Sequence, residues 1–242
     1  MNNPLIRIIH IPVYLALLVS LTIALGAASV FLSLFSPRAG RYVTNSLWGH
    51  LALDPAGLRL KTVGRENLPD SSGGFIIYAN HSSMADIPTV ALSTGRPVTW
   101  VAKASLGRIP FFGWALARVH MLVDRGGGAE AARKMVEEAE ARLKRGEILS
   151  IFPEGTRNRG RELLLPFKKG AFILAKHTGT PIVPVAIKKA GRLWPAGKFW
   201  PRPGLIRVKI GPPLSPRPGE KLAALTLRAR EALHDLLADE GW

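Results

Sequence analysis

The sequence predicts an α/β sheet covered by helices, preceded by an N-terminal membrane-anchoring helical segment. Three observations support this prediction. Residues 11–35 contain no charged residue, and from Gly57 onward short β-rich segments alternate with helical ones. One of these β-rich segments, 75–79, leads directly into a short corner that carries His81 and Asp86. Alternation of this kind is typical of a sheet with helices on its faces.

The uncharged run 11–35 is the candidate anchor. As a helix it would be about 37 Å long at ~1.5 Å per residue, enough to cross a hydrocarbon core of ~30 Å, although it could equally lie within one leaflet. A cleaved secretory signal is disfavoured, because the apolar run continues beyond the small residues that resemble a cleavage site. Residues 40–52 carry Tyr42 and Trp48 among apolar neighbours. They predict a second short helix, either at the membrane interface or in the core.

The charges after the apolar run predict its orientation. Arg38 and Arg41 follow it directly, and the first acidic residue is Asp54. By the positive-inside bias the rest of the chain faces the cytoplasm, so we expect it at the inner (cytoplasmic) membrane. We therefore divide the chain into N-terminal membrane-anchoring helices at 1–52 and an α/β domain at 53–242.

Composition restricts the classes of function. The 242 residues are 47% hydrophobic, include no cysteine and carry a net charge of +16. Disulfides, thiolate catalysis and cysteine metal sites are thereby excluded. The positive charge indicates an anionic partner, either nucleic acid or a phospholipid surface with phosphorylated substrates. A nucleic-acid-binding protein is disfavoured, because the basic residues are scattered and a transmembrane-length apolar run has no role in such a protein.

The expected strands are short apolar segments bounded by turn residues, with helices between them. The segment at 129–145 is a charged helix with a solvated face, and an amphipathic helix closes the chain between Leu222 and Leu237. The expected strands are 58–63, 75–79, 98–102, 120–123, 148–152, 182–187 and 206–210.

The corner after strand 75–79 is the first candidate site. Residues five apart in one helix point about 140° away from each other, so His81 and Asp86 can meet only if the helix begins between Ser83 and Asp86. The carboxylate can then accept a hydrogen bond from one ring nitrogen and leave the other free as a base. The alternative is that Ser83 and Asp86 form a capping box, with His81 an ordinary loop residue.

A second candidate site follows strand 148–152. Glu154, Gly155, Arg157 and Arg159 occupy a turn at the strand end, where loops of α/β sheets bind ligands. Glycine permits close backbone approach, and a guanidinium group can grip phosphate with two charge-assisted hydrogen bonds. Taken alone, the turn could also be a surface loop with a local ion pair.

These two stretches together resemble the glycerolipid acyltransferases, and most closely the bacterial 1-acyl-sn-glycerol-3-phosphate acyltransferases. The resemblance rests on His81 with Asp86 five residues on, followed by residues 152–157. Two further blocks lie in family order between and after them. These blocks are Lys103 through Leu106 with Pro110, Gly113 and Arg125, and then residues 183–187.

The resemblance implies a mixed sheet covered by helices, as in glycerol-3-phosphate acyltransferases. It also implies transfer of a fatty acyl group from an acyl thioester to the sn-2 hydroxyl of lysophosphatidate, giving phosphatidate for phospholipid biosynthesis. By this resemblance His81 is the general base and Asp86 orients it. The substrate-binding residues it implies are Lys103, Arg125, Glu154, Gly155, Thr156 and Arg157.

No cofactor and no metal are expected, and acyl-CoA or acyl carrier protein would be the co-substrate. The implied partners are the phospholipid membrane and lysophosphatidate, without nucleic acid. Two departures from the family pattern are Ser105, where many relatives have glutamate, and residues 158–160, where many have serine and acidic residues. Glycerol 3-phosphate or another lysolipid is the alternative acceptor, and a non-catalytic membrane scaffold is a further alternative.

Overall fold

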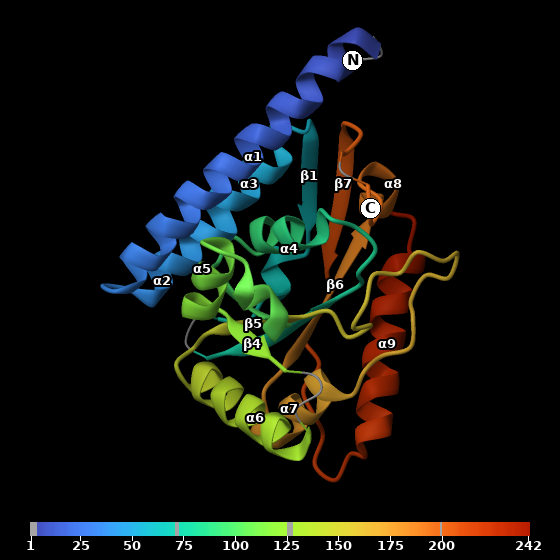
Figure 1. Ribbon diagram of the computed structural model, residues 1–242. Coiled ribbons are helices and arrows are strands. Elements are labelled where there is room, and N and C mark those ends of the chain that lie inside the picture. The colour runs from blue at the N-terminus through green and yellow to red at the C-terminus, as the bar shows by residue number, and fades with distance from the viewer. Residues whose placement is uncertain (1–3, 71–72, 125–127, 199) are drawn as a thin grey trace.

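A mixed sheet of seven strands forms the centre of the computed structural model, which describes residues 4–70, 73–124, 128–198 and 200–242 (Figure 1). The spatial order of the strands is β1-β7-β6-β2-β5-β3-β4. The strands are β1 (Leu58–Val63), β2 (Phe75–Ala79), β3 (Val98–Lys103), β4 (Met121–Val123), β5 (Ile148–Ile151), β6 (Ile182–Lys188) and β7 (Gly204–Ile210).

Strand direction decides where the ends of the strands meet. β2 runs parallel to both β5 and β6, and β3 runs parallel to both β5 and β4, so five carboxyl ends lie at one edge of the sheet. β7 is antiparallel to β6 and parallel to β1. The seven expected strands and the mixed α/β fold are therefore confirmed, with strand ends shifted by no more than two residues.

Helices cover both faces of the sheet (Figure 1). A π-helical turn, η1 (Val43–Leu47), joins α2 to α3 without a break. The α-helices are α1 (Pro4–Ser33), α2 (Pro37–Tyr42), α3 (Trp48–Leu53), α4 (Asp86–Thr94), α5 (Phe112–Val119), α6 (Gly128–Lys144), α7 (Gly170–Thr178), α8 (Ala190–Leu193) and α9 (Leu222–Ala238). The 3-10 turns are η2 (Arg65–Asn67) and η3 (Ala104–Arg108).

Alternation along β2 shows how the two faces are filled. Phe75 and Ile77 point into a core shared with α1, α3 and α4, whereas Ile76 and Tyr78 point into a core shared with α6, α7 and α9. All four side chains are completely buried. Each fully buried side chain of this size contributes about 1.5–3 kcal/mol, so β2 is fixed between two packed layers and cannot shift in register.

The N-terminal helix α1 packs along the domain. Tyr14 is 6% exposed and donates a hydrogen bond to the carbonyl of Ala52 at 2.9 Å. Near the other end of the helix, the Ser29 hydroxyl donates to the carbonyl of Gly40 at 2.9 Å. Among the described residues, one helical stretch, Pro12–Ser33, is long and apolar enough to cross a membrane. The helix thus combines an inner face that contacts the protein with an outer face of exposed apolar side chains.

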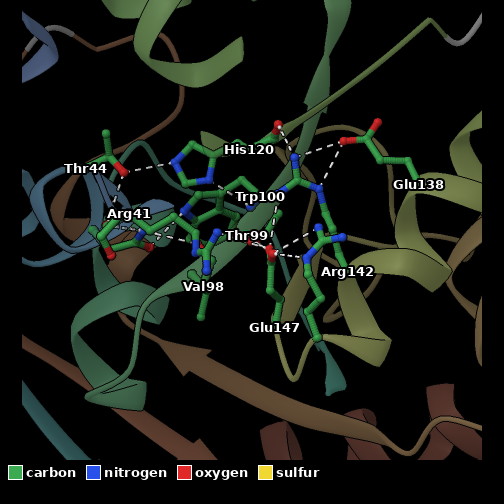
Figure 2. Close-up of polar contacts among 12 residues, drawn as sticks. Arg41, Thr44, Val98, Thr99, Trp100, His120, Glu138, Arg142 and Glu147 are labelled. Atoms are coloured by element: carbon green, nitrogen blue, oxygen red, sulfur yellow. Dashed lines mark hydrogen bonds and ion pairs between the residues drawn. The ribbon is translucent and has the colours of Figure 1, made fainter. Parts of the chain in front are cut away.

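A buried ionic cluster joins the N-terminal helices to the sheet (Figure 2). The carboxylate of Glu147 lies 3.2 Å from Arg41, 3.1 Å from Arg142 and 3.2 Å from Arg145, and it accepts a hydrogen bond from Thr99 at 2.9 Å. Burial alone would raise the pKa of Glu147, but Arg41, the Thr99 hydroxyl and Arg142 together hold it below the ordinary value. One carboxylate therefore balances three guanidinium groups between α2 and β5.

His120 belongs to the same region and is completely buried as a neutral ring (Figure 2). Burial lowers the pKa of His120 to about 3, with further lowering by Arg41 and Arg142. Its Nδ1 accepts the backbone N–H of Trp100 at 3.2 Å, so Nε2 carries the proton and donates to the Thr44 hydroxyl at 3.0 Å. This histidine bridges β3 and η1.

Candidate active site

The corner between β2 and α4 brings His81 and Asp86 into contact. α4 begins at Asp86, so the two side chains are separated by a turn and not by a helical arc. His81 Nδ1 lies 2.8 Å from Asp86 Oδ2, and the carboxylate is fully buried, whereas the imidazole is 12% exposed. A carboxylate at this distance keeps the proton on Nδ1 and leaves Nε2 as the basic nitrogen. Nε2 has no hydrogen-bond partner among the residues that the structure describes.

Asp86 is held by more than the histidine. Its Oδ2 also accepts the backbone N–H of Ser82 at 2.6 Å and that of Ser83 at 2.8 Å. The bond from Ser83 is one half of a capping box, but the Ser83 hydroxyl accepts the N–H of Ala85 and donates to the carbonyl of Trp194. The two interpretations of the corner are therefore not exclusive, because one carboxylate oxygen both caps the turn and orients His81.

An aromatic stack fixes the plane of the imidazole. The rings of His81 and Phe152 lie 4.0 Å apart at 12°, and Phe152 in turn stacks on Trp100 at 5.7 Å and 16°. Trp100 Nε1 donates to the side-chain oxygen of Asn45 at 3.2 Å. The stack extends from the catalytic corner across β5 and β3 to η1. Its role was not predicted, although Phe152 stands at the start of the second motif.

Glu154 connects the two motifs through the backbone. One carboxylate oxygen accepts the N–H of His81 at 2.7 Å, and the other accepts the N–H of Leu165 at 2.9 Å. The residue is 2% exposed. Burial raises the pKa of Glu154, an effect that the two backbone N–H groups partly offset. Since both oxygens are engaged, Glu154 acts on the position of His81 in this structure.

Two asparagines complete the frame around His81. The Asn80 side chain donates to the carbonyl of Ile187 at 3.0 Å and accepts the N–H of Ile187 at 2.8 Å. The N–H of Asn158 donates to the carbonyl of His81 at 2.6 Å. The catalytic corner is thus clamped to β6 on one side and to the loop after β5 on the other. Sequence reasoning missed both clamps, because they join residues far apart in the chain.

The predicted substrate-binding residues that the structure describes lie at the same edge of the sheet. Gly155 adopts a positive φ of 71°, which favours glycine. Thr156 is exposed, while Arg157 is half-buried, and its Nε is buried without a hydrogen-bond partner among the described residues. Lys103 is exposed at the end of β3, two strand spacings or about 10 Å from β2. Arg125 lies outside the described residues, so its predicted role is untested.

The segment after β6 packs beside the corner through Trp194. Trp194 is 6% exposed, and its carbonyl accepts hydrogen bonds from the Ser83 hydroxyl and from the N–H of Met84. This aromatic side chain packs against the corner and is not presented to solvent. Among the described residues, no group of three or more histidines and carboxylates is placed to hold a metal ion.

A histidine oriented by a buried carboxylate, next to a glycine-containing turn with an arginine, is suited to deprotonating a hydroxyl group beside an anionic substrate. The comparisons with known proteins place the chain among the acyltransferases. Residues 59–188 match the family model described as Acyltransferase. The 1-acyl-sn-glycerol-3-phosphate acyltransferase of Escherichia coli (strain K12) is 37% identical over 75% of this chain and 73% of its own length. That of Pseudomonas aeruginosa is 33% identical over 88% of this chain and 84% of its own. The chain belongs to the 1-acyl-sn-glycerol-3-phosphate acyltransferase family.

A solved structure agrees with this assignment. The 1-acyl-sn-glycerophosphate (LPA) acyltransferase PlsC from Thermotoga maritima superposes with a TM-score of 0.78 at 25% identity, covering 98% of each chain. The chain spans only about half the length of the chloroplast relatives, for example 56% of the Arabidopsis thaliana enzyme LPAT1 at 31% identity.

Proposed function

We propose that this protein transfers a fatty acyl group from an acyl thioester to the sn-2 hydroxyl of lysophosphatidate and so makes phosphatidate. The observation that carries the proposal is the geometry of His81. Its Nδ1 faces the buried Asp86 at 2.8 Å, its ring is stacked on Phe152, and Nε2 is left as a base. The donor is acyl-CoA or acyl carrier protein, and the chemistry requires no cofactor.

The reaction needs one proton to be moved twice. Nε2 of His81 takes the proton of the acceptor hydroxyl while its oxygen attacks the thioester carbonyl carbon. The tetrahedral intermediate then expels the thiolate as the C–S bond breaks, and the imidazolium returns the proton to sulfur. A positioned base contributes typically 10²- to 10⁴-fold. Ser82 and Ser83 direct their N–H groups to Asp86, so these groups hold the base and are not donors to the oxyanion.

The acceptor phosphate is assigned to the predicted substrate residues. Arg157 supports this assignment, because a buried guanidinium Nε without a protein partner is suited to a ligand anion. Gly155 brings the backbone close without a side chain, and Thr156 supplies an exposed hydroxyl. Lys103, and with it Arg125, would add charge from the β3 and β4 side. Glycerol 3-phosphate remains the second candidate acceptor because it presents the same phosphate.

The N-terminal region supports attachment to a membrane. Exposed apolar side chains run along α1, including Leu17, Val19 and Phe31, and Phe111 and Trp114 add exposed rings beside it. The backbone of Phe111 lies against α1, since a Cβ at Gly26 would be 3.1 Å from its carbonyl oxygen. Because α1 is docked on the domain along its length, we place it within one leaflet, with the catalytic edge at the headgroup layer.

We assign residues 1–52 to this anchoring part and residues 53–242 to the catalytic domain, at the cytoplasmic face of the inner membrane. Cell fractionation checks the anchor. The full chain should sediment with membranes and require detergent for extraction. Recovery in the soluble fraction of a detergent-free lysate would overturn the membrane assignment.

The catalytic proposal is tested by product analysis of the purified full chain. Labelled lysophosphatidate, other lysolipids and glycerol 3-phosphate are each offered with acyl-CoA and with acyl carrier protein. Phosphatidate should form from lysophosphatidate, and His81→Ala should abolish it. Acylation of glycerol 3-phosphate but not of lysophosphatidate would replace the proposed acceptor. Turnover by His81→Ala at the wild-type rate would remove the proposed base.

A further inference from the structure

A charged cavity opens next to the corner between β2 and α4 that carries His81 and Asp86. It has a volume of about 410 Å³ and begins at Ser82, the residue after His81. Arg159, Lys189 and Arg192 line it, together with Gly191 and neighbouring residues, and no carboxylate is among the lining residues. We call this cavity the basic pocket. Arg159 lies in the turn of the second candidate site but beyond the motif residues 152–157, and Lys189 and Arg192 lie at the junction of β6 and α8, beyond the motif residues 183–187.

The three cationic side chains of the basic pocket have no partner of opposite charge among the described residues. All three side chains are exposed, and none forms a hydrogen bond or an ion pair with any residue that the structure describes. On α6, by contrast, the surface arginine Arg133 lies 2.9 Å from Glu130. Three unpaired positive charges around one cavity create a local potential that attracts anions. The basic pocket is therefore suited to a phosphate group.

Two segments carry these cations, the turn after β5 and the junction of β6 with α8. Both are hydrogen-bonded to the corner that carries His81, directly or through a neighbouring residue. Asn158, one residue before Arg159, donates its N–H to the carbonyl of His81 at 2.6 Å. On the other side, Ser83 forms a β-bridge with Pro195 and a 2.6 Å hydrogen bond to the carbonyl of Trp194. The backbone segments that carry the cations are thus held near the base by hydrogen bonds on either side of it.

Gly191 keeps the mouth of the basic pocket open. A Cβ at this position would lie 3.0 Å from the Ser82 hydroxyl and 3.2 Å from its Cβ. Gly191 therefore allows α8 to approach the corner closely, because a larger residue would need Ser82 to shift. Lys189, at the end of β6, adopts a positive φ of 69°, which is uncommon for a residue other than glycine.

The order of the strands separates Lys189 and Arg192 of the basic pocket from the predicted acceptor cation Lys103. Arg159 lies between them, in the turn after β5 that also carries Arg157. At the carboxyl edge, β6 with Lys189 lies on one side of β2, and β5, β3 and β4 lie on the other. Lys103 is at the end of β3, on that other side. A two-substrate transfer needs two anionic molecules to meet at one base. If the acceptor phosphate lies on the β3 side, the basic pocket is left for the donor.

We propose that the basic pocket binds the phosphate of the phosphopantetheine arm through which the acyl donor carries its thioester. The inference rests on the proposed function and adds the place of the second substrate. Coenzyme A and acyl carrier protein share this phosphorylated arm, so the chemistry is the same for both sources. The acyl thioester reaches His81 past Ser82, and the phosphate is held by Lys189, Arg192 and Arg159.

The test compares three donors with the same acyl chain: acyl-CoA, acyl-phosphopantetheine and acyl-pantetheine, which lacks the phosphate. The variant Lys189→Gln/Arg192→Gln removes two cations from exposed positions, so its unfolding temperature should equal that of the wild type. Its KM for the two phosphorylated donors should rise roughly tenfold or more. Its KM for acyl-pantetheine and for lysophosphatidate should stay within about twofold.

Lys176→Gln is the matched control. Lys176 is exposed on α7, outside the basic pocket, so its loss lowers the net charge without affecting the donor. Equilibrium binding of free coenzyme A, measured by calorimetry, supplies a readout that does not depend on turnover. It should weaken in the double variant and not in the control.

The outcomes separate the two proposals. If the wild-type protein transfers no acyl group to lysophosphatidate from any donor, the proposed function fails. If the wild type is active but the double variant keeps its KM for phosphorylated donors, the basic pocket is not the donor site. An increase in the lysophosphatidate KM alone would assign the pocket to the acceptor, and an effect confined to acyl-CoA would exclude the arm phosphate. Equal effects with acyl-CoA and acyl-phosphopantetheine would support the shared phosphate.

Discussion

Replacing Asp86 with asparagine tests the catalytic corner most directly. The substitution keeps the size of the side chain and removes its charge. In the wild-type protein the buried Oδ2 accepts three hydrogen bonds, from the His81 ring and from the N–H groups of Ser82 and Ser83. In the variant, the side-chain amide oxygen can still accept them, but as a neutral acceptor.

The expected loss follows from the number of bonds. A hydrogen bond to a charged group contributes about 1.5–3 kcal/mol and a neutral one about 0.5–1.5 kcal/mol, a difference of about 1 kcal/mol per bond. The two backbone bonds then account for about 2 kcal/mol of stability, which lowers Tm by about 4–8 °C for a chain of this size. The third bond, together with the lost stabilisation of the imidazolium, should lower kcat by roughly 10- to 100-fold.

The assay measures thiol release during acyl transfer, with thermal unfolding in the same detergent. His81→Ala sets the lower limit, with a loss of roughly 10²-fold or more. The chain also offers a matched control, because His50 and Asp54 form the same kind of pair at 3.0 Å on the surface, with side chains 62% and 63% exposed. Asp54→Asn should leave both activity and Tm near the wild-type values, since exposed pairs contribute little.

Two results would refute this reasoning. Turnover by Asp86→Asn within twofold of the wild type would mean that the carboxylate does not orient or stabilise the base. An equal loss of activity in Asp54→Asn would mean that the effect reports a general change in charge.

Three further predictions concern the surroundings of the corner. Arg157→Lys should raise the KM for lysophosphatidate far more than that for the donor, because lysine lacks the planar fork that grips phosphate; steady-state kinetics that raise both equally would contradict the assignment. Phe152→Leu should lower kcat about tenfold with little change in either KM, because the His81 ring loses its stacking surface; an unchanged kcat would show that the stack does not position the base. Finally, His120 has a folded-state pKa of about 3, below its ordinary 6.5, and the pKa of Glu147 lies below its ordinary 4.5. Both groups therefore contribute stability that is lost as pH falls. The loss begins at about pH 6.5 for His120 and below pH 4.5 for Glu147. Tm of the wild type should therefore decrease from pH 6.5 to 4.5 more steeply than that of His120→Gln, and parallel curves would refute the assignment to His120.

The strands and the corner were predictable because each depends on neighbouring residues. A short apolar run such as 75–79 identifies a strand by its own composition. The contact between His81 and Asp86 requires only that a helix begin between them. The sheet order was not predictable in the same way: β1 pairs with β7, which lies near the other end of the chain, and no local pattern encodes that pairing.

The residues that support the site were missed for the same reason. Glu154 was predicted to bind substrate from its place in the motif, but its contact with the backbone of His81 depends on β2 and β5 being neighbours. The ring of Phe152 meets that of His81 through the same adjacency. The Asn80 clamp on Ile187 likewise depends on the pairing of β2 with β6. Such contacts follow from the three-dimensional sheet order and not from spacing in the sequence.

The pairing of β1 with β7 has a consequence for biosynthesis. During synthesis α1 and β1 leave the ribosome before β2 to β6, but the only strand that pairs with β1 in the described structure, β7, follows all of these strands. The clamp of Asn80 on Ile187 and the bond from Ser83 to Trp194 also form late in synthesis. A prematurely terminated product would therefore carry the apolar helix together with unpaired strand edges. Its His81 would lack the contacts that hold the corner in place. Such fragments would be inactive and prone to edge-to-edge aggregation, so only a polypeptide that extends through β7 acquires both the full sheet and an ordered histidine.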